Sequence, residues 1–226
     1  MCNVSCAVFG ARALSKDDIE GKKYLEVGAR DYNGTIRPLI DSWEPALSLG
    51  IDLIEGPGVD KVLDADDMVR EFGEGSFDVV VAMEIMEHTR DWRRTMSNIK
   101  RVCRPGGIIV LTTRSFGYGY HAYPYDFWRF EIEDIKAIFS DCEIQILEKD
   151  PTCPGIYLKA RKPAGFVERD LTEHALYSMI TGGRLKTIED EHFRRWRYLH
   201  LAAKHRIRQA VIDGFHGIGG WLFSRL

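Results

Sequence analysis

The fold is decided by residues 24–34, which read Tyr-Leu-Glu-Val-Gly-Ala-Arg-Asp-Tyr-Asn-Gly. A short apolar run ends here in an acid, Glu26, and a glycine, Gly28. Glycine at the carboxyl end of a strand lets the backbone approach a ligand closely, and the helix that follows offers unpaired N–H groups. The stretch therefore predicts a strand that turns into a nucleotide-binding loop, although a plain tight turn explains these residues equally well when they are taken alone.

Four further apolar segments follow in a fixed order, and each has the length of a strand. They are residues 50–53, 62–65, 77–83 and 108–112. The run 77–83 is almost continuously apolar, as in strands that a parallel sheet buries on both faces. A helical stretch at 92–103 and a breaker at 105–107 precede the last segment. Strands that alternate with helices predict an open parallel sheet with a ligand crevice at the carboxyl ends of its strands.

Two alternating segments near residue 150 predict an antiparallel hairpin. They are residues 143–148 and 156–160, and a turn at 150–155 separates them. Such an ending argues against a nicotinamide-dependent dehydrogenase, whose sheet is usually all parallel and whose loop prefers a triple-glycine spacing. We therefore expect an α/β protein with a Rossmann-like, doubly wound sheet of about seven strands and a terminal antiparallel hairpin.

Five short motifs, taken in order and spacing, resemble one known family. They are Leu25-Glu26-Val27-Gly28, Gly50-Ile51-Asp52, Leu63-Asp64-Ala65-Asp66, the run from Ser76 to His88, and Arg104-Pro105-Gly106-Gly107. Through them residues 20–162 resemble the class I S-adenosylmethionine-dependent methyltransferases, in the small-molecule, type 11-like subgroup. The resemblance implies S-adenosylmethionine as cofactor and S-adenosylhomocysteine as product. The family usually repeats glycine two residues after Gly28, whereas this chain has Arg30 there and its next glycine, Gly34, comes late.

The resemblance also implies which residues bind the cofactor. Asp52 would receive the ribose hydroxyls, and Glu26 with the backbone at Gly28 would border the polar tail. The adenine would lie beside residues 64–66, where a carboxylate accepts from the exocyclic amine. The predicted cofactor-binding residues are Glu26, Gly28, Arg30, Asp52, Leu53, Asp64, Ala65, Asp66, Glu84 and His88. An alternative remains open for each of these acids. Either acid of residues 64–66 caps the helix that follows, Glu26 caps its own loop, and Asp52 is a solvated residue at the end of its strand.

The segment 114–129 is the candidate acceptor site, because it is unusually rich in aromatic, His, Asp and Arg side chains for a loop. His121 titrates near neutrality and is the candidate base, and Asp126 is the candidate orienting acid. The alternative is that Phe127 and Trp128 anchor the next helix in the core while His121 is a satisfied surface residue.

A metal site is the second interpretation of the residues that follow strand 77–83. Glu84, Glu87 and His88 would share one helical face, and their spacing resembles that of ubiquinone-pathway O-methyltransferases, which would imply a divalent cation. We expect no metal, with Glu84 and His88 at the edge of the cofactor pocket and Glu87 capping or pairing nearby. Cys2 and Cys6 lack a second ligand pair, so we expect no metal there either.

Composition is that of a soluble enzyme with one main core. The 226 residues are 45% hydrophobic, and a net charge of −3 gives no global attraction to nucleic acid. Five cysteines, an odd number, do not form a disulfide framework. The sequence has neither a signal peptide nor an apolar run long enough to span a bilayer, so we expect a cytoplasmic protein.

The chain changes character near residue 163. We expect a methyltransferase domain over 1–163 and a helical extension over 164–226, with helices at 171–180 and 189–210 and an apolar tail at 215–223. We expect the extension to cover the sheet or to form a dimer contact. The alternative is a basic amphipathic surface that docks on a membrane or an acidic partner.

Three function classes remain. We favour a methyltransferase that acts on oxygen of a small molecule or saccharide. A nucleic-acid base methyltransferase is disfavoured, because residues 82–84 lack the Asn/Asp-Pro-Pro-aromatic signature of enzymes that methylate exocyclic amines. The others are a methyltransferase that acts on a macromolecule and a non-catalytic module that binds S-adenosylmethionine, for which the altered glycine loop is the one supporting feature.

Overall fold

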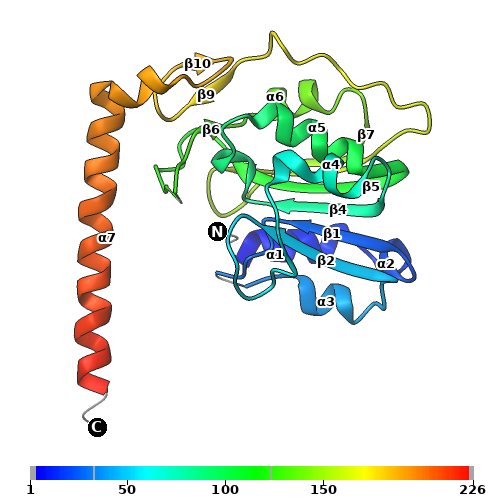
Figure 1. The fold of residues 1–226 in the computed structure, drawn as a ribbon, viewed down its shortest axis with the longest axis horizontal. Coiled ribbons are helices and arrows are strands. Elements are labelled where there is room, and N and C mark those ends of the chain that lie inside the picture. The colour runs from blue at the N-terminus through cyan, green and yellow to red at the C-terminus, as the bar shows by residue number, and fades with distance from the viewer. Residues whose placement is uncertain (1–3, 33, 123, 224–226) are drawn as a thin grey trace.

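The computed structural model describes residues 4–32, 34–122 and 124–223, and over 213–223 it describes the backbone alone. Figure 1 shows a central sheet with helices on both faces and one long C-terminal helix beside this body. Cys2, Tyr123 and the side chains of the apolar tail lie outside the described part, so the predictions made for them are not pursued.

The main sheet has seven strands in the order β3-β2-β1-β4-β5-β8-β7. The strands are β1 (Lys23–Val27), β2 (Leu47–Asp52), β3 (Lys61–Val62), β4 (Phe77–Met83), β5 (Cys103–Arg114), β7 (Glu143–Lys149) and β8 (Gly155–Arg161). Strands β1 to β5 pair in parallel, and β8 is antiparallel to both of its neighbours. This arrangement confirms the predicted doubly wound sheet and its terminal hairpin.

Alternation along β4 explains why its sequence is apolar throughout. Val80 and Ala82 join one core cluster, whereas Val79 and Val81 join the cluster on the other face of the sheet. Successive side chains of a strand point to opposite faces, so a strand covered on both sides needs apolar residues at every position. The carboxyl ends of β1, β2 and β4 are aligned by their register, which places their loops at one edge of the sheet.

Six helices besides the C-terminal one cover the two faces in the described part of the chain (Figure 1). They are α1 (Val4–Ala13), α2 (Lys16–Ile19), α3 (Arg37–Asp41), α4 (Met68–Phe72), α5 (Trp92–Val102) and α6 (Ile132–Ile138). Short 3-10 helices span Ala65–Asp67, Met86–His88 and Asp190–Arg194. Helix α1, which the sequence analysis did not identify, packs on the hairpin by stacking Phe9 on Tyr157 with ring centroids 4.6 Å apart.

A second sheet joins the acceptor loop to the C-terminal segment. Its strands are β6 (Trp128–Arg129), β9 (Leu176–Ser178) and β10 (Arg184–Leu185), all paired antiparallel. The predicted helix at 171–180 is therefore wrong. Leu176 and Ser178 are fully buried on either side of a half-buried Tyr177, a period of two that fits strand pairing with β6. The breaker predicted at 105–107 lies inside β5, where the pairing with β4 jumps from Cys103 to Ile108, so these residues interrupt the strand pairing without ending the strand.

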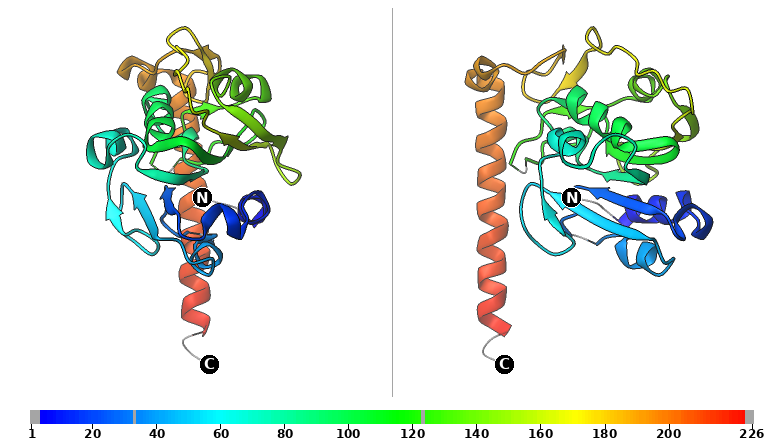
Figure 2. Two further views of the ribbon diagram at one scale, coloured as in Figure 1. Left: turned by 90° about the vertical axis from the view of Figure 1, so that its right-hand side faces the viewer. Right: turned by 45° about the vertical axis from the view of Figure 1, so that its right-hand side comes forward.

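Helix α7 (Trp196–Phe223) follows the 3-10 helix Asp190–Arg194. Figures 1 and 2 agree that it extends alongside the body and does not lie on a face of the main sheet, contrary to the expected covering role. Its first turns contact the body, since Tyr198 meets Phe193 and His205 meets Tyr120 with ring centroids 5.0 and 5.7 Å apart. None of the described helices is both long enough and apolar enough to cross a membrane.

Candidate cofactor pocket and acceptor site

A cavity of about 160 Å³ opens at the carboxyl ends of β1, β2 and β4. Nine of the ten predicted cofactor-binding residues line it: Glu26, Gly28, Arg30, Asp52, Leu53, Asp64, Ala65, Glu84 and His88. The tenth, Asp66, is not part of its wall. The sequence analysis did not single out Thr35, Ile85 or Pro124, which also line the cavity and carry no motif signal.

Gly28 shapes the floor of the cavity. Its φ is 76°, a left-handed value that side chains disfavour, and a Cβ there would collide with Ile85. Its N–H donates to the carbonyl of Ile51 at 2.9 Å, which ties the loop after β1 to β2. Glycine at this position therefore keeps the loop close to the neighbouring strand and leaves room for a ligand.

Glu26 presents an unpartnered carboxylate oxygen. The side chain is buried, and its Oε1 accepts from Thr35 Oγ1 at 3.3 Å, whereas Oε2 has no hydrogen-bond partner within the described residues. Burial raises the pKa of Glu26 to about 7, against the opposing effects of Arg37 and of the Thr35 hydrogen bond. A ligand that brings a cationic donor to Oε2 would satisfy this oxygen and stabilise its charge.

Asp52 sits between two loops. Its Oδ1 accepts from the N–H of Ile54 at 3.0 Å and its Oδ2 from the N–H of Arg30 at 3.3 Å. Each carboxylate oxygen has a further lone pair, so the group can still accept from hydroxyls of a ligand. Arg30 itself lies over the ring of Tyr32 at 4.6 Å.

The acids at 64–66 divide into two roles. Asp64 lines the cavity and caps the 3-10 helix, because its Oδ1 accepts from the N–H of Asp66 at 2.9 Å. Asp66 instead accepts from Thr95 Oγ1 at 2.6 Å and holds this turn against α5. Burial raises the pKa of Asp66 in this position. The capping alternative thus describes a contact of Asp64, which also lines the cavity, whereas Asp66 neither caps the helix nor lines the cavity.

These residues fit S-adenosylmethionine. Glu26 offers an unsatisfied oxygen for its ammonium group, Asp52 offers acceptors for its ribose, and the Gly28 loop leaves room that a Cβ would fill. The backbone and side chains at residues 63–65 close the far end of the cavity, where an adenine would lie.

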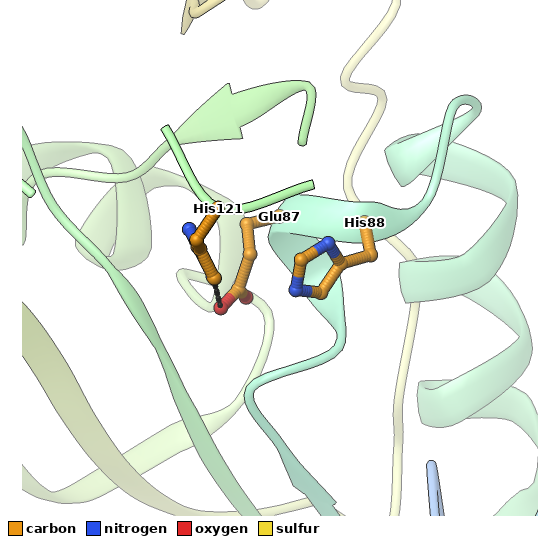
Figure 3. Close-up of side chains that lie close together, drawn as sticks. All are labelled: Glu87, His88 and His121. Atoms are coloured by element: carbon orange, nitrogen blue, oxygen red, sulfur yellow. Dashed lines mark ion pairs between the residues drawn. The ribbon is translucent and has the colours of Figure 1, made fainter. Parts of the chain in front are cut away.

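His121 lies in a row of charged groups beside this cavity. Its Nδ1 is 3.0 Å from Asp126 Oδ2, and its Nε2 is 3.7 Å from Glu87 Oε1. Asp126 also receives two hydrogen bonds from Arg129, at 2.5 and 2.7 Å. Figure 3 shows His121 and His88 on either side of the Glu87 carboxylate. His121 is therefore not a satisfied surface residue, although Phe127 and Trp128 are buried core residues as the alternative supposed.

The charges explain how these groups titrate. Burial alone would lower the pKa of His121, but the hydrogen bonds and ion pairs with Asp126 and Glu87 outweigh it and raise the pKa to about 9. Burial would raise the pKa of Asp126, yet the hydrogen bonds from Arg129 and His121 lower it to about 2. Burial lowers the pKa of His88, whose Nδ1 donates to the carbonyl of Tyr125 at 2.6 Å. At neutral pH the histidine pair is thus one imidazolium and one neutral ring.

The structure changes which residues could form the metal site. Glu84 precedes the short helix Met86–His88 with a φ of 57°, so it does not share a helical face with Glu87 and His88. Its carboxylate forms a buried ion pair with Arg114. Among the described residues, the group that could hold a cation is instead Glu87, His88 and His121, whose ligand atoms lie within 4.8 Å of one another. The expectation that no metal is used stays a prediction.

The strand order, the cavity at the strand ends and the polar group beside it are those of a nucleotide-binding α/β fold. A family model described as "Methyltransferase domain" (Methyltransf_23) matches residues 6–210, and the chain belongs to this family.

Solved structures show the same fold at low sequence identity. The chain is similar to the 1,6-didemethyltoxoflavin-N1-methyltransferase of Burkholderia thailandensis, with a TM-score of 0.57, 12% identity, and 71% and 79% of the two chains covered. It is also similar to the [4+2]-cyclase SpnF, with a TM-score of 0.54, 17% identity, and 71% and 81% covered.

Curated relatives match over a short segment. The highly reducing polyketide synthase azaB of Aspergillus niger is 35% identical over 54 residues, which is 23% of this chain and 2% of that protein. The chain thus spans a very small part of the curated relatives it matches.

Proposed function

We propose that the protein transfers a methyl group from S-adenosylmethionine to an oxygen of a small molecule or saccharide, with His121 as the base. The observation that carries this proposal is the position of His121, whose ring lies 4.8 Å from that of His88, a residue of the cavity wall. A base next to the cofactor pocket can take the proton of a hydroxyl that is held there for methylation.

Each residue has a defined task in this proposal. S-adenosylmethionine supplies a methyl group that is already activated for transfer. Glu26 and Asp52 bind and orient it, and the Gly28 loop admits it. Asp126 holds the Nδ1 of His121, and Nε2, which lies 3.7 Å from Glu87 Oε1, accepts the proton of the acceptor once the ring is neutral. Arg129 keeps Asp126 ionised, since it donates to both carboxylate oxygens.

The aromatic side chains of the loop support a saccharide or another ring-shaped acceptor. Phe116 and Tyr125 are exposed, and Tyr118 lies over the guanidinium of Arg114 at 4.2 Å. Aromatic rings with polar tips stack on sugar rings and also bond their hydroxyls. The similar enzyme of Burkholderia thailandensis binds 1,6-didemethyltoxoflavin, a small molecule, which also favours a small acceptor.

Alternatives with the same fold remain distinct proposals. The similarity to a [4+2]-cyclase shows that this fold also occurs in an enzyme named for other chemistry, so reaction type rests on the site. The bulky Arg30 is the one feature that favours a non-catalytic module that binds the cofactor. A macromolecular acceptor stays the alternative to a small one, and a homodimer stays a possibility. A cytoplasmic location and the absence of a nucleic-acid partner stay predictions.

The test is transfer of a labelled methyl group. The purified protein is incubated with methyl-labelled S-adenosylmethionine and fractions of a cell extract, and the labelled product is identified by mass spectrometry and NMR. We expect a methyl ether on a small molecule or saccharide. A methyl group on nitrogen, or label on protein or nucleic acid, would contradict the proposed acceptor. Tight binding of S-adenosylhomocysteine with no transfer to any fraction would favour the non-catalytic module.

A further inference from the structure

Helix α7 carries an outward stripe of apolar side chains over its described part. Trp196, Leu199, Ile207 and Val211 have exposed fractions of 79%, 50%, 67% and 52%. Their spacing of three, eight and four residues keeps them on one side of a helix with 3.6 residues per turn. The exposed Ala203 falls on the same side, so the stripe is continuous.

The opposite side of the helix faces the body. The half-buried residues there are Tyr198, Leu201, Ala202 and His205. Tyr198 and His205 make ring contacts with Phe193 and Tyr120, so the body fixes which side of α7 points outward. No residue of the described chain covers the apolar stripe, whose largest members are exposed by half or more.

Basic residues outnumber acidic ones on this helix. Helix α7 and the two residues before it contain six Arg or Lys and one acid, Asp213, although the whole chain has a net charge of −3. All six are exposed: Arg194, Arg195, Arg197, Lys204, Arg206 and Arg208. A long amphipathic helix with Arg and Lys beside an apolar stripe, and with tryptophan in that stripe, has the composition of helices that lie in a lipid interface.

We propose that α7 docks on the surface of an anionic lipid bilayer, with its apolar stripe among the acyl chains and its Arg and Lys among the headgroups. The positive charge of α7 favours an anionic bilayer over a second copy of the chain. A second copy of α7 would bring two strongly positive helices together, which is electrostatically unfavourable, whereas anionic headgroups neutralise each Arg and Lys. The helix lies on the bilayer and does not cross it, in keeping with the result that no described helix can span a membrane.

Vesicle binding tests the proposal with the full chain and without any methyl transfer. Vesicles of phosphatidylcholine alone are compared with vesicles that contain phosphatidylglycerol as well, and bound protein is measured by flotation. We expect binding to the anionic vesicles that falls as salt is raised and little binding to the zwitterionic ones. Equal binding to both vesicles, or to neither, would overturn the proposal.

Variants with matched controls show whether α7 is the contact. Lys204→Glu with Arg208→Glu should lower the vesicle partition coefficient by about tenfold or more, and Ile207→Gln should lower it too. The controls are Lys149→Glu with Arg169→Glu, which changes net charge equally, and Val167→Gln, which removes an apolar side chain that is even more exposed than Ile207. Losses of the same size in the controls would place the contact elsewhere. A dimer in light scattering that the α7 variants dissociate would also overturn the proposal in favour of a second copy.

Discussion

At the scale of single residues, the charge of His121 governs when the proposed base can act. Its pKa of about 9 means that the ring carries a proton at neutral pH and accepts another group's proton only after losing it. We therefore expect turnover to rise with pH until about pH 9 and then to level off, as measured by kcat against pH at saturating substrates.

Substitution separates this role from cofactor binding. His121→Gln should lower kcat by about 10²–10⁴-fold with almost unchanged affinity for S-adenosylhomocysteine, because loss of a base affects the chemical step alone. His200→Gln, at an exposed histidine of α7, is the control. If His121→Gln keeps near-normal turnover and the same rise of kcat with pH, then another group is the base.

Asp52 gives a prediction about affinity. Asp52→Ala should weaken binding of S-adenosylmethionine by about 1.5–3 kcal/mol in calorimetry, the range for loss of charged hydrogen bonds. Asp66→Ala is the control, since Asp66 bonds Thr95 outside the cavity and its loss should affect stability more than affinity. Equal affinities for Asp52→Ala and the parent protein would remove Asp52 from the binding site.

Chelation tests the group formed by Glu87, His88 and His121. We expect EDTA to leave methyl transfer unchanged, because a cation at Nε2 of His121 would have to compete with the proton of a ring whose two nitrogens lie 3.7 Å from Glu87 and 3.0 Å from Asp126. Transfer measured before and after dialysis against EDTA decides the question. Loss of activity that added magnesium or zinc restores would show that these three residues do hold a metal.

At the scale of elements, the loop after β1 depends on Gly28. Gly28→Ala introduces a Cβ that meets Ile85 in a left-handed backbone conformation, so we expect the free energy of unfolding to fall by about 1–3 kcal/mol. Affinity for the cofactor should fall as well. Gly165→Ala, where a Cβ meets nothing within 4 Å, should change neither quantity. Denaturant unfolding and calorimetry measure the two effects, and an unchanged Gly28→Ala protein would show that the loop can move aside.

The sequence predicted those elements whose local pattern and final environment agree. Strand β4 was predictable because burial on both faces requires the unbroken apolar run that its sequence displays. The strand at 176–178 was not, because its pairing partner in β6 lies almost fifty residues earlier and local propensity favours a helix. The breaker at 105–107 interrupts the pairing of β5 but does not end the strand, because pairing with β4 resumes at Ile108, where pairing with β8 begins.

In the candidate site, too, only residues whose positions follow from local motifs were predictable. Residues near the strand ends, such as Glu26 and Asp52, follow from the topology that their motifs imply. The contact between Glu87 and His121 joins the 3-10 helix Met86–His88 to the loop before β6, so no local spacing revealed it. The buried pairing of Glu84 with Arg114 was hidden likewise, and it changed the members of the group that could bind a cation.

At the scale of the whole molecule, ligand binding should appear as thermal stability. S-adenosylmethionine or S-adenosylhomocysteine should raise the melting temperature and NAD should not, because a ligand that binds the native state alone stabilises it by mass action. Differential scanning fluorimetry at increasing ligand concentration measures this. Stabilisation by NAD without any by S-adenosylmethionine would be inconsistent with the cofactor assignment.

The small sheet β6-β9-β10 has a practical consequence for work on this enzyme. The N–H of Phe127 donates to the carbonyl of Glu87 at 2.7 Å, and the N–H of Met179 donates to the carbonyl of Phe127 at 2.8 Å. One backbone ladder therefore runs from the group around His121 to the segment that leads into α7. A truncation after residue 163 would remove β9, which pairs with β6, and would expose the buried Phe127 and Trp128 to solvent. Loss of activity in a truncated protein would therefore reflect damage to the acceptor loop. Point substitutions on the outward side of α7 avoid this damage and so separate membrane docking from catalysis.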